Sequence, residues 1–583
     1  MQLKSEYVMM PDGIRLAVDI WMPDPAIFPE PKPGVLSSTR YWRSEQLPDG
    51  ALASARRMEE AVVFTDHGFV LVIADMRGSG ASFGNRQGEW SQQEVEDIGN
   101  LVEWIALQDW CNGKVGAFGI SYAANTAFHA AANCCPSLEV ISPQFGDYDP
   151  YTQIMCPGGL PNAWLMGNWG AYTHALDRND SDTVAQYLDP DNPEPDAPPG
   201  KGVSPVDGDD GSLLKEAVAQ HADNANLLAL KDSMTFRDDS ITEDADTSLS
   251  GCCTVIGRSQ VPVFYYAGWQ DAGTSEGALN LFCSYSNPMR VRIGPWNHGM
   301  FNWHDPFDTA PPKALAVEDN IREVIDNIGP YLKEGAAGPP SRGRVLEYYT
   351  MGENRWKSTD TWPVAGTETQ RLYLGAERCL QNTRPESADG CDSYQVDPEF
   401  TTGKSNRWHT QMGRSPVVFD DRSDDADKAL VYTGAPLDAD TEVTGRPAVA
   451  LYVSSTAGDG YFLAYLQMVA PNGRVTTITE GYLRALHRKI EQNPAVKGVD
   501  YPHSFKRADG MPMIPGKIEE VRFSLYPTSI LIPAGYSLRL TISCADKDTF
   551  ELVDECANAT ISLMRNSSAA SFLELPVVAG SAQ

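Results

Sequence analysis

An alternation of apolar runs with helix-compatible segments stops, returns and stops again along the 583-residue chain, and this pattern constrains its fold more than any other feature. Short apolar runs alternate with helix-compatible segments up to about residue 145, and the alternation returns between about residues 251 and 345. Continuous apolar strands separated by helices are typical of a buried parallel sheet. After about residue 345, β-branched or alternating runs bounded by Pro and Gly replace the helices. Such runs are typical of a β-sandwich or jelly roll. We therefore predict an α/β fold class with a separate C-terminal β domain.

The segment between the two α/β parts has a different composition. It is rich in Trp and Asn, and then in Pro and Asp over residues 189–196, which rules out a packed helix or central strand there. Residues 213–231 predict one amphipathic helix. We expect residues 146–250 to form an inserted helical cap, residues 1–145 and 251–345 to form a split α/β domain, and residues 346–583 to form the β domain.

The charge balance excludes several partners. The chain has 46 Lys and Arg against 78 Asp and Glu, a net charge of −32. Binding to nucleic acid or to an anionic membrane surface needs the opposite excess. No apolar run reaches the roughly 18 to 20 residues of a spanning helix, and the first residues lack a signal-peptide pattern. The 11 cysteines fit a reducing compartment better than a disulfide framework. We predict a soluble cytoplasmic protein.

The sharpest chemical motif is an apolar strand that leads directly into Gly119-Ile120-Ser121 and then into a helix-forming stretch of small residues. This order is typical of a nucleophile elbow, in which a sharp turn exposes the serine hydroxyl at a helix N-terminus. Ala123 stands where the G-x-S-x-G pattern has its second glycine. An ordinary helix-capping serine is the alternative. We favour Ser121 as a nucleophile because strand, turn and helix occur in the required order.

Two later residues complete the set that an activated serine needs. Asp271 follows an apolar strand at residues 262–267, and His298 follows the next strand at residues 290–293. The carboxyl ends of strands are where open α/β sheets build their sites, and Ser, then Asp, then His is the α/β-hydrolase order. A helix cap for Asp271 and a backbone-bonded loop histidine for His298 are the alternatives. Each is less convincing when all three residues occur in order.

Several motifs in order and spacing resemble the cocaine-esterase-like, X-prolyl-dipeptidyl-peptidase-like serine hydrolases, which include the α-amino-acid ester hydrolases. The resemblance covers nearly the whole chain. It rests on Met10-Pro11-Asp12-Gly13, Asp75-Met76-Arg77-Gly78-Ser79-Gly80, Trp110-Cys111-Asn112-Gly113, Gly119-Ile120-Ser121-Tyr122, Gly268-Trp269-Gln270-Asp271, Gly294-Pro295-Trp296-Asn297-His298 and Met351-Gly352-Glu353-Asn354-Arg355-Trp356. The resemblance implies an α/β-hydrolase domain, a helical cap and a jelly-roll domain, with Ser121, Asp271 and His298 as the catalytic triad.

The resemblance also implies residues that the pattern alone would not select. The family's oxyanion hole pairs the N–H after the nucleophile, here that of Tyr122, with a tyrosine hydroxyl after an early strand, here that of Tyr41. The neighbouring Trp42 and the cap residues Trp164 and Trp169 are the matching candidates for the acyl pocket. Interdomain packing is an equally good account of the cap tryptophans.

We predict a serine hydrolase that cleaves a small carboxylic ester through an acyl-enzyme, with no metal and no organic cofactor. Amide hydrolysis, as in X-prolyl dipeptide release, and α-amino-acid ester hydrolysis or acyl transfer remain open alternatives. A non-catalytic binding protein is a third. Relatives often self-associate, so the resemblance also implies a possible homo-oligomer.

Overall fold

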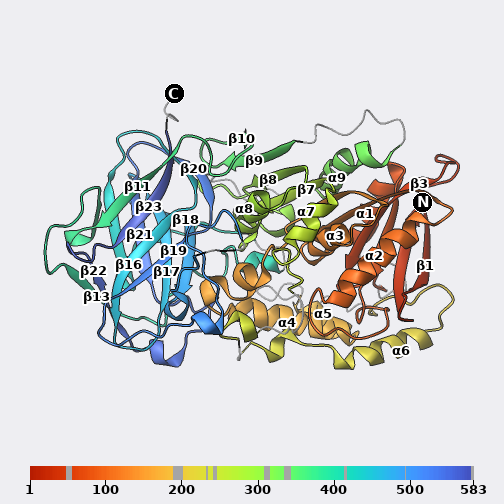
Figure 1. Ribbon diagram of the computed structural model, residues 1–583, viewed down its shortest axis with the longest axis horizontal. Coiled ribbons are helices and arrows are strands. Elements are labelled where there is room, and N and C mark those ends of the chain that lie inside the picture. The colour runs from red at the N-terminus through yellow and green to blue at the C-terminus, as the bar shows by residue number, and fades with distance from the viewer. Residues whose placement is uncertain are drawn as a thin grey trace.

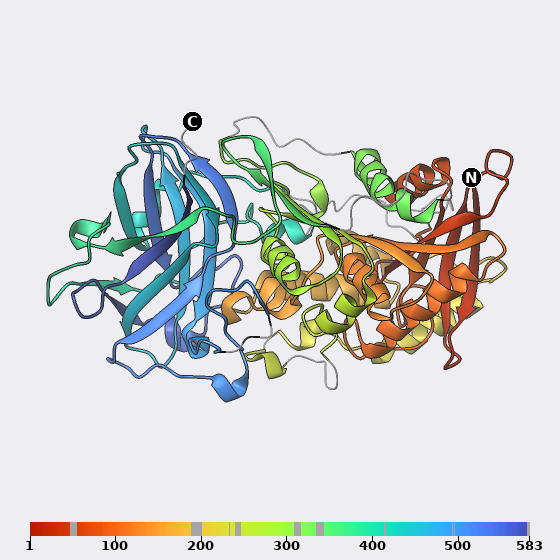
Figure 2. The ribbon, with the colours of Figure 1, turned by 45° about the horizontal axis from the view of Figure 1, so that its top comes forward.

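The computed structural model describes residues 1–46, 55–187, 201–231, 234–239, 246–307, 316–333, 343–412, 416–492, 494 and 496–579. The N-terminal strands and the C-terminal β domain lie at opposite ends of the molecule (Figures 1 and 2). Between them a helical segment runs along one side of the sheet, at the bottom of Figure 1. The acidic run at residues 189–196 lies outside the described residues.

Within the described chain, ten strands form the first sheet in the order β1-β2-β4-β3-β5-β6-β7-β8-β9-β10. Their bounds are β1 Gln2–Met9, β2 Arg15–Met22, β3 Lys32–Thr39, β4 Val70–Asp75, β5 Cys111–Ile120, β6 Leu138–Gln144, β7 Val263–Gly268, β8 Met289–Gly294, β9 Arg344–Thr350 and β10 Arg355–Thr359. Neighbouring strands are parallel from β4 through β9, while β1, β2 and β10 add antiparallel pairs at the edges. The carboxyl ends of β5, β7 and β8 therefore lie along one edge.

Helices cover both faces of this sheet. Helices α1 (Ala55–Asp66) and α9 (Val317–Leu332) pack with Val35 and Leu71 on one face. Helices α2 (Gln92–Ala106), α3 (Tyr122–Ala132) and α8 (Thr274–Ser284) pack with Leu36 and Val72 on the other. Because successive strand residues point to opposite faces, strands covered on both sides must be apolar throughout. The continuous apolar runs in the sequence are explained by this two-sided burial.

The inserted segment follows β6 and precedes β7. Its α-helices are α4 (Ala163–Asp177), α5 (Ser181–Tyr187) and α6 (Ser212–Gln220), and α7 (Cys253–Ser259) lies closer to α3. The prediction of one helix over residues 213–231 is wrong, because α6 ends at Gln220 and only short 3₁₀ turns follow. The buried His221 ring contacts the carbonyl oxygens of Asp177 and Ser82 instead of continuing an exposed helix. Tertiary hydrogen bonds outweigh the helix propensity here.

Among the described residues, the remaining strands form a second, 13-stranded β assembly, in which ten strands follow the order β13-β22-β16-β23-β11-β12-β14-β21-β17-β18. Strands β15, β19 and β20 pair off this path. The bounds are β11 Thr367–Leu374, β12 Cys379–Gln381, β13 Cys391–Gln395, β14 Leu430–Pro436, β15 Thr441–Gly445, β16 Ala448–Ser455, β17 Tyr461–Val469, β18 Val475–Arg484, β19 Glu519–Ser524, β20 Thr528–Ile532, β21 Ser537–Ser543, β22 Thr560–Met564 and β23 Phe572–Val578. Strand β16 pairs with three other strands, β19, β22 and β23, and the strand-rich assembly is consistent with the predicted sandwich.

One predicted boundary needs correction. The predicted β domain starts at residue 346, but residues 344–350 form β9, which pairs in parallel with β8 of the first sheet. Strand β10 then extends that sheet to Thr359. A β-branched run shows that a strand forms but not which sheet it joins. Within the described ranges, none of the helices has the length and apolarity that crossing a bilayer requires.

Candidate active site

The turn between β5 and α3 has the strained geometry that a nucleophile elbow requires. Ser121 has φ +60° and ψ −124°, and α3 begins at the next residue. A Cβ atom on Gly119 would lie 2.3 Å from the carbonyl oxygen and 2.5 Å from the Cβ of Ala123. Position 119 must therefore lack a side chain, because the atoms it would meet first belong to the backbone of residue 123. Because Gly119 does, the alanine at 123 is accommodated, and the departure from G-x-S-x-G leaves the turn intact.

The predicted acid and base lie beside each other. Asp271 follows β7 and is completely buried, and His298 follows β8. The Nδ1 atom of His298 lies 3.1 Å from each carboxylate oxygen of Asp271. The hydroxyl of Thr274 donates to Asp271 Oδ2 at 2.9 Å. The carboxylate is therefore oriented toward Nδ1 of the imidazole, as in the acid–base pair of a catalytic triad.

A residue that the sequence reasoning missed also contacts this pair. The side-chain amide of Gln411, from the C-terminal region, donates to Asp271 Oδ1, and its Nε2 lies 3.3 Å from His298 Nδ1. Gln411 lies 140 residues after Asp271 in the sequence. No motif or spacing in the sequence marks it.

Tyr41 follows β3, and its hydroxyl accepts a hydrogen bond from Trp169 Nε1 at 2.9 Å. Its ring packs edge-on against that of Tyr122, with 6.0 Å between the ring centroids. Burial raises the pKa of Tyr41 well above its usual range. The phenol therefore stays protonated. Its O–H can donate a hydrogen bond while its oxygen accepts the one from Trp169.

Tyr122 is anchored from its side chain. Its hydroxyl donates to Glu94 Oε1 at 2.6 Å, and its ring stacks on Trp90 with 4.9 Å between centroids. Burial raises the pKa of Glu94 to about 7. Sequence reasoning missed Glu94 and Trp90. The Ser91-x-x-Glu94 spacing marks only a helix cap, which the structure also contains.

The three tryptophans predicted to line a pocket occupy different environments. Trp42 is buried and donates from its indole N–H to Leu176 O at 3.1 Å, so it packs the cap onto the first domain. Trp164 lies over His409 of the C-terminal region, with 4.2 Å between the ring centroids. Trp169 alone contacts Tyr41. The structure thus brings one of the three directly to the predicted oxyanion hole.

A further carboxyl group, that of Asp147, lies near the acid–base pair at the carboxyl end of β6. It is almost fully buried, and its backbone N–H donates to Asn125 Oδ1 at 2.9 Å. Burial, followed by the negative charge of Asp271, raises the pKa of Asp147 to about 7.

Comparisons with known proteins identify the family and the fold of the chain. A family model described as X-Pro dipeptidyl-peptidase (S15 family) matches residues 12–300, and one described as the X-Pro dipeptidyl-peptidase C-terminal non-catalytic domain matches residues 342–566. A Mycobacterium bovis protein named as a serine esterase is 37% identical, covering 99% of this chain and 96% of the relative. The cocaine esterase of a Rhodococcus species is 25% identical, over 92% of this chain and 90% of that protein.

Solved structures share the fold along the chain. An α-amino acid ester hydrolase superposes with a TM-score of 0.73 at 18% identity, covering 99% of this chain and 96% of the other. A CocE/NonD family hydrolase from Staphylococcus aureus gives a TM-score of 0.69 at 18% identity, with coverages of 99% and 94%. These likenesses confirm the predicted α/β-hydrolase fold. Given the family matches and a 37% identical relative that spans 99% of it, the chain belongs to the S15 family of serine hydrolases, which also contains the cocaine-esterase-like enzymes.

Proposed function

We propose that this chain hydrolyses small carboxylic esters through Ser121, His298 and Asp271. The observation that carries the proposal is the backbone of Ser121, at φ +60°. Non-glycine residues persist in this region only where the surrounding structure holds them, and they cluster at active sites. Here the strain places a hydroxyl at the N-terminus of a helix, where backbone N–H groups favour developing negative charge.

The proposed reaction proceeds in two halves. Nε2 of His298 takes the proton of Ser121 as its Oγ attacks the acyl carbonyl, and Asp271 stabilises the imidazolium that forms. The Tyr122 N–H and the Tyr41 hydroxyl donate to the oxyanion. His298 then protonates the leaving alcohol, which leaves an acyl-enzyme on Ser121. Water activated by the same imidazole attacks the acyl-enzyme and releases the acid.

The names of several relatives support an ester as the substrate. The 37% identical relative is named as a serine esterase, the 25% identical one is a cocaine esterase, and a structural neighbour is an α-amino acid ester hydrolase. These names describe those proteins. For this chain they support a small acyl ester as the substrate class.

Replacing the nucleophile tests the proposal. Ser121→Ala should abolish turnover of a chromogenic acyl ester while the folded state is kept, as checked by circular dichroism. Ser142→Ala is a matched control, since Ser142 is a buried serine on the adjacent strand β6, and it should leave turnover near wild type. Retention of more than about a thousandth of the wild-type rate by Ser121→Ala would contradict the assignment.

Amide or α-amino-ester hydrolysis is the second candidate, favoured by Asp147 and by the name of the matching family model. A buried carboxyl beside the acid–base pair is a group that can pair with a substrate amine. Asp149, two residues on, is already engaged by both terminal nitrogens of Arg237. Turnover of an α-amino acyl ester, its des-amino analogue and a prolyl dipeptide anilide should be compared. Preference for the des-amino ester would exclude this candidate.

A further inference from the structure

A segment of the C-terminal region, residues 406–411, lies directly against the loop that carries the catalytic acid. The N–H of Ala272 donates to the carbonyl oxygen of Arg407 at 3.1 Å. In return Arg407 Nη1 donates to the carbonyl oxygen of Ala272, also at 3.1 Å. Ala272 has φ +33°, a strained value for alanine. Both polar backbone groups of the residue after Asp271 are thus held by one arginine of the other domain.

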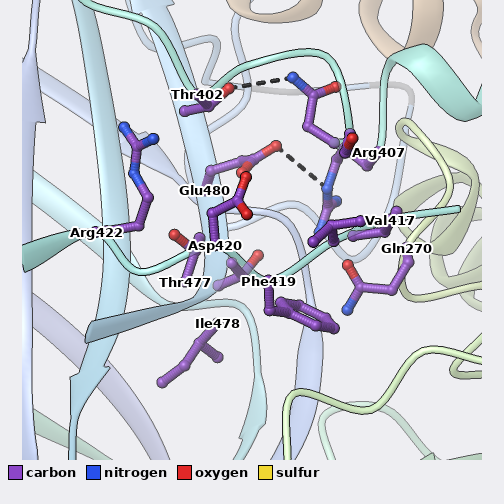
Figure 3. Close-up of a pocket in the computed structure, with 14 residues that line it drawn as sticks. Gln270, Thr402, Arg407, Val417, Phe419, Asp420, Arg422, Thr477, Ile478 and Glu480 are labelled. Carbon is purple, nitrogen blue, oxygen red and sulfur yellow. Dashed lines mark hydrogen bonds and ion pairs between the residues drawn. The ribbon is translucent and has the colours of Figure 1, made fainter. Parts of the chain in front are cut away.

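That arginine is itself anchored in the β domain. Its Nε forms an ion pair with Glu480 of β18 at 3.3 Å, and its guanidinium lies 4.9 Å from the ring centroid of Tyr526. Figure 3 shows this ion pair beside Gln270, the residue that precedes the acid, across a small pocket between the two domains. The segment is therefore tied to the β domain through Arg407.

The same segment is tightened internally. The side-chain oxygen of Asn406 accepts from the N–H groups of Trp408 and His409, at 3.0 and 3.2 Å. The indole N–H of Trp408, which is almost fully buried, donates to Tyr482 Oη at 3.0 Å. These contacts fix where the last residue of the segment, Gln411, presents its side chain.

Gln411 completes the hydrogen bonding of the acid. An ionised carboxylate only accepts, so the atom that faces Asp271 Oδ1 must be the amide nitrogen. Thr274 donates to the other oxygen, Oδ2. Each carboxylate oxygen thus has one donor besides His298, one from its own loop and one from the β domain. This pairing fixes the plane of the carboxylate against the imidazole.

We infer that Gln411 is a positioning residue of the triad, through which the C-terminal domain takes part in catalysis. The inference rests on the proposed function, because it assumes that Asp271 and His298 act on Ser121. The amide N–H holds Asp271 in the orientation that accepts from His298 Nδ1, and it disperses part of the carboxylate charge. Losing the donor leaves the carboxylate free to turn and makes it a stronger counter-ion for the imidazolium.

Two substitutions of Gln411 distinguish the effect of its hydrogen bond to Asp271 from the effect of its packing. Gln411→Ala should lower kcat/KM for an acyl ester about tenfold, the loss typical of a hydrogen bond to a charged group. Gln411→Glu keeps the size of the side chain but replaces the donor with an acceptor, so it should lower kcat/KM at least as much. In Gln411→Ala the acidic limb of the kcat/KM profile should also move to higher pH, by about half a unit.

Arg446→Ala is the matched control. Arg446 crosses the same domain boundary and donates to Asn280 Oδ1 on α8 at 2.6 Å, without contacting the acid–base pair. It should lower the thermal midpoint about as much as Gln411→Ala while leaving the shape of the pH profile unchanged. An equal shift of the acidic limb in Arg446→Ala would overturn the inference, because loosened domain docking would then explain it.

Two further outcomes are decisive. Wild-type kcat/KM and an unchanged profile in Gln411→Glu would reduce Gln411 to a packing role and overturn the inference. Ser121→Ala, measured in parallel, keeps this failure separate from failure of the proposed function. An inactive Ser121→Ala with fully active Gln411 variants rejects the positioning role alone, whereas an active Ser121→Ala rejects the triad itself.

Discussion

The nucleophile is held by residues close to it in the sequence or on the neighbouring strand, whereas the acid is held from two domains. The Ser121 N–H donates to Gln144 O of the adjacent strand at 2.9 Å, and the turn depends on the fit between Gly119 and Ala123. The loop of Asp271 depends on Arg407, 135 residues beyond Ala272, and on Gln411. The position of Ser121 thus depends on a local turn, and that of Asp271 depends on a contact between domains.

This difference indicates where the enzyme tolerates change. Substitutions that crowd the elbow should disrupt it, whether or not the contacts with the C-terminal domain are intact. The acid–base pair should respond to substitutions on either side of the domain boundary. The following predictions test that division, beginning with the largest expected effect.

Asp271→Asn should have the greatest effect on activity. The amide cannot hold His298 with Nδ1 protonated or stabilise the imidazolium, so kcat should fall about 10⁴-fold while folding persists. Labelling of Ser121 by a fluorophosphonate should slow in parallel. A loss of less than tenfold would show that the elbow works without the acid and would break the comparison.

Tyr41→Phe removes the hydroxyl that we assign to the oxyanion hole. The expected loss in kcat is about 10²- to 10³-fold, as for other single oxyanion donors. Because Trp169 donates to this hydroxyl, the mutant also leaves an indole N–H without its acceptor. Trp169→Phe removes only that indole contact and serves as the control. Equal losses in the two variants would assign the effect to packing of the cap.

Gly119→Ala should disrupt the elbow by crowding. The added methyl group would meet the Ala123 carbonyl oxygen at 2.3 Å, and the backbone there cannot move without disturbing β5 or α3. We expect the free energy of unfolding to fall by about 3 kcal/mol in urea titrations. Ala123→Gly, on the other side of the same contact, should cost only about 1 kcal/mol. The reverse order would show that the contact does not shape the turn.

Asp147→Asn should have the smallest effect of these substitutions, which is a weaker dependence of the free energy of unfolding on pH. In the folded protein the pKa of Asp147 is raised to about 7, against about 3.9 for an unfolded chain. The folded state therefore binds the proton more tightly. This contribution to stability is complete below the unfolded pKa and is lost as pH rises through about 7.

Between pH 5 and pH 8 the wild type should accordingly lose about 2 kcal/mol more stability than Asp147→Asn. Urea unfolding at the two pH values measures this difference. The same loss in both proteins would mean that Asp147 titrates normally, and that the pair of Asp271 and His298 has no second buried carboxyl beside it.

Much of the fold follows from local patterns. The apolar runs at residues 69–74 and 115–120 became β4 and β5 because burial on both faces demands continuous apolar residues. Sequence patterns gave the wrong structure where contacts with residues far along the chain determine it. The run at residues 345–349 formed a strand as expected but joined the first sheet, and the helix expected over residues 213–231 ended at Gln220, where His221 finds buried carbonyl partners.

The candidate site divides in the same way. Ser121, Asp271 and His298 could be selected because each follows a strand whose carboxyl end reaches the same edge of the sheet. Tyr41 needed the family resemblance, since a single tyrosine after a strand carries no signal of its own. Trp42 and Trp164 were selected on the same ground, yet they contact Leu176 and His409 at domain boundaries.

Local patterns were enough to predict the parts of the site that have a local cause: the strand, glycine and serine that make the elbow, and the order of acid and base along the chain. The groups that hold the acid depend instead on how the domains pack. Arg407 and Gln411 meet the acid loop because two separately folded domains pack together, and such contacts leave no periodicity or spacing in the sequence. Hydrogen bonds between residues more than 130 positions apart depend on the final packing of the domains.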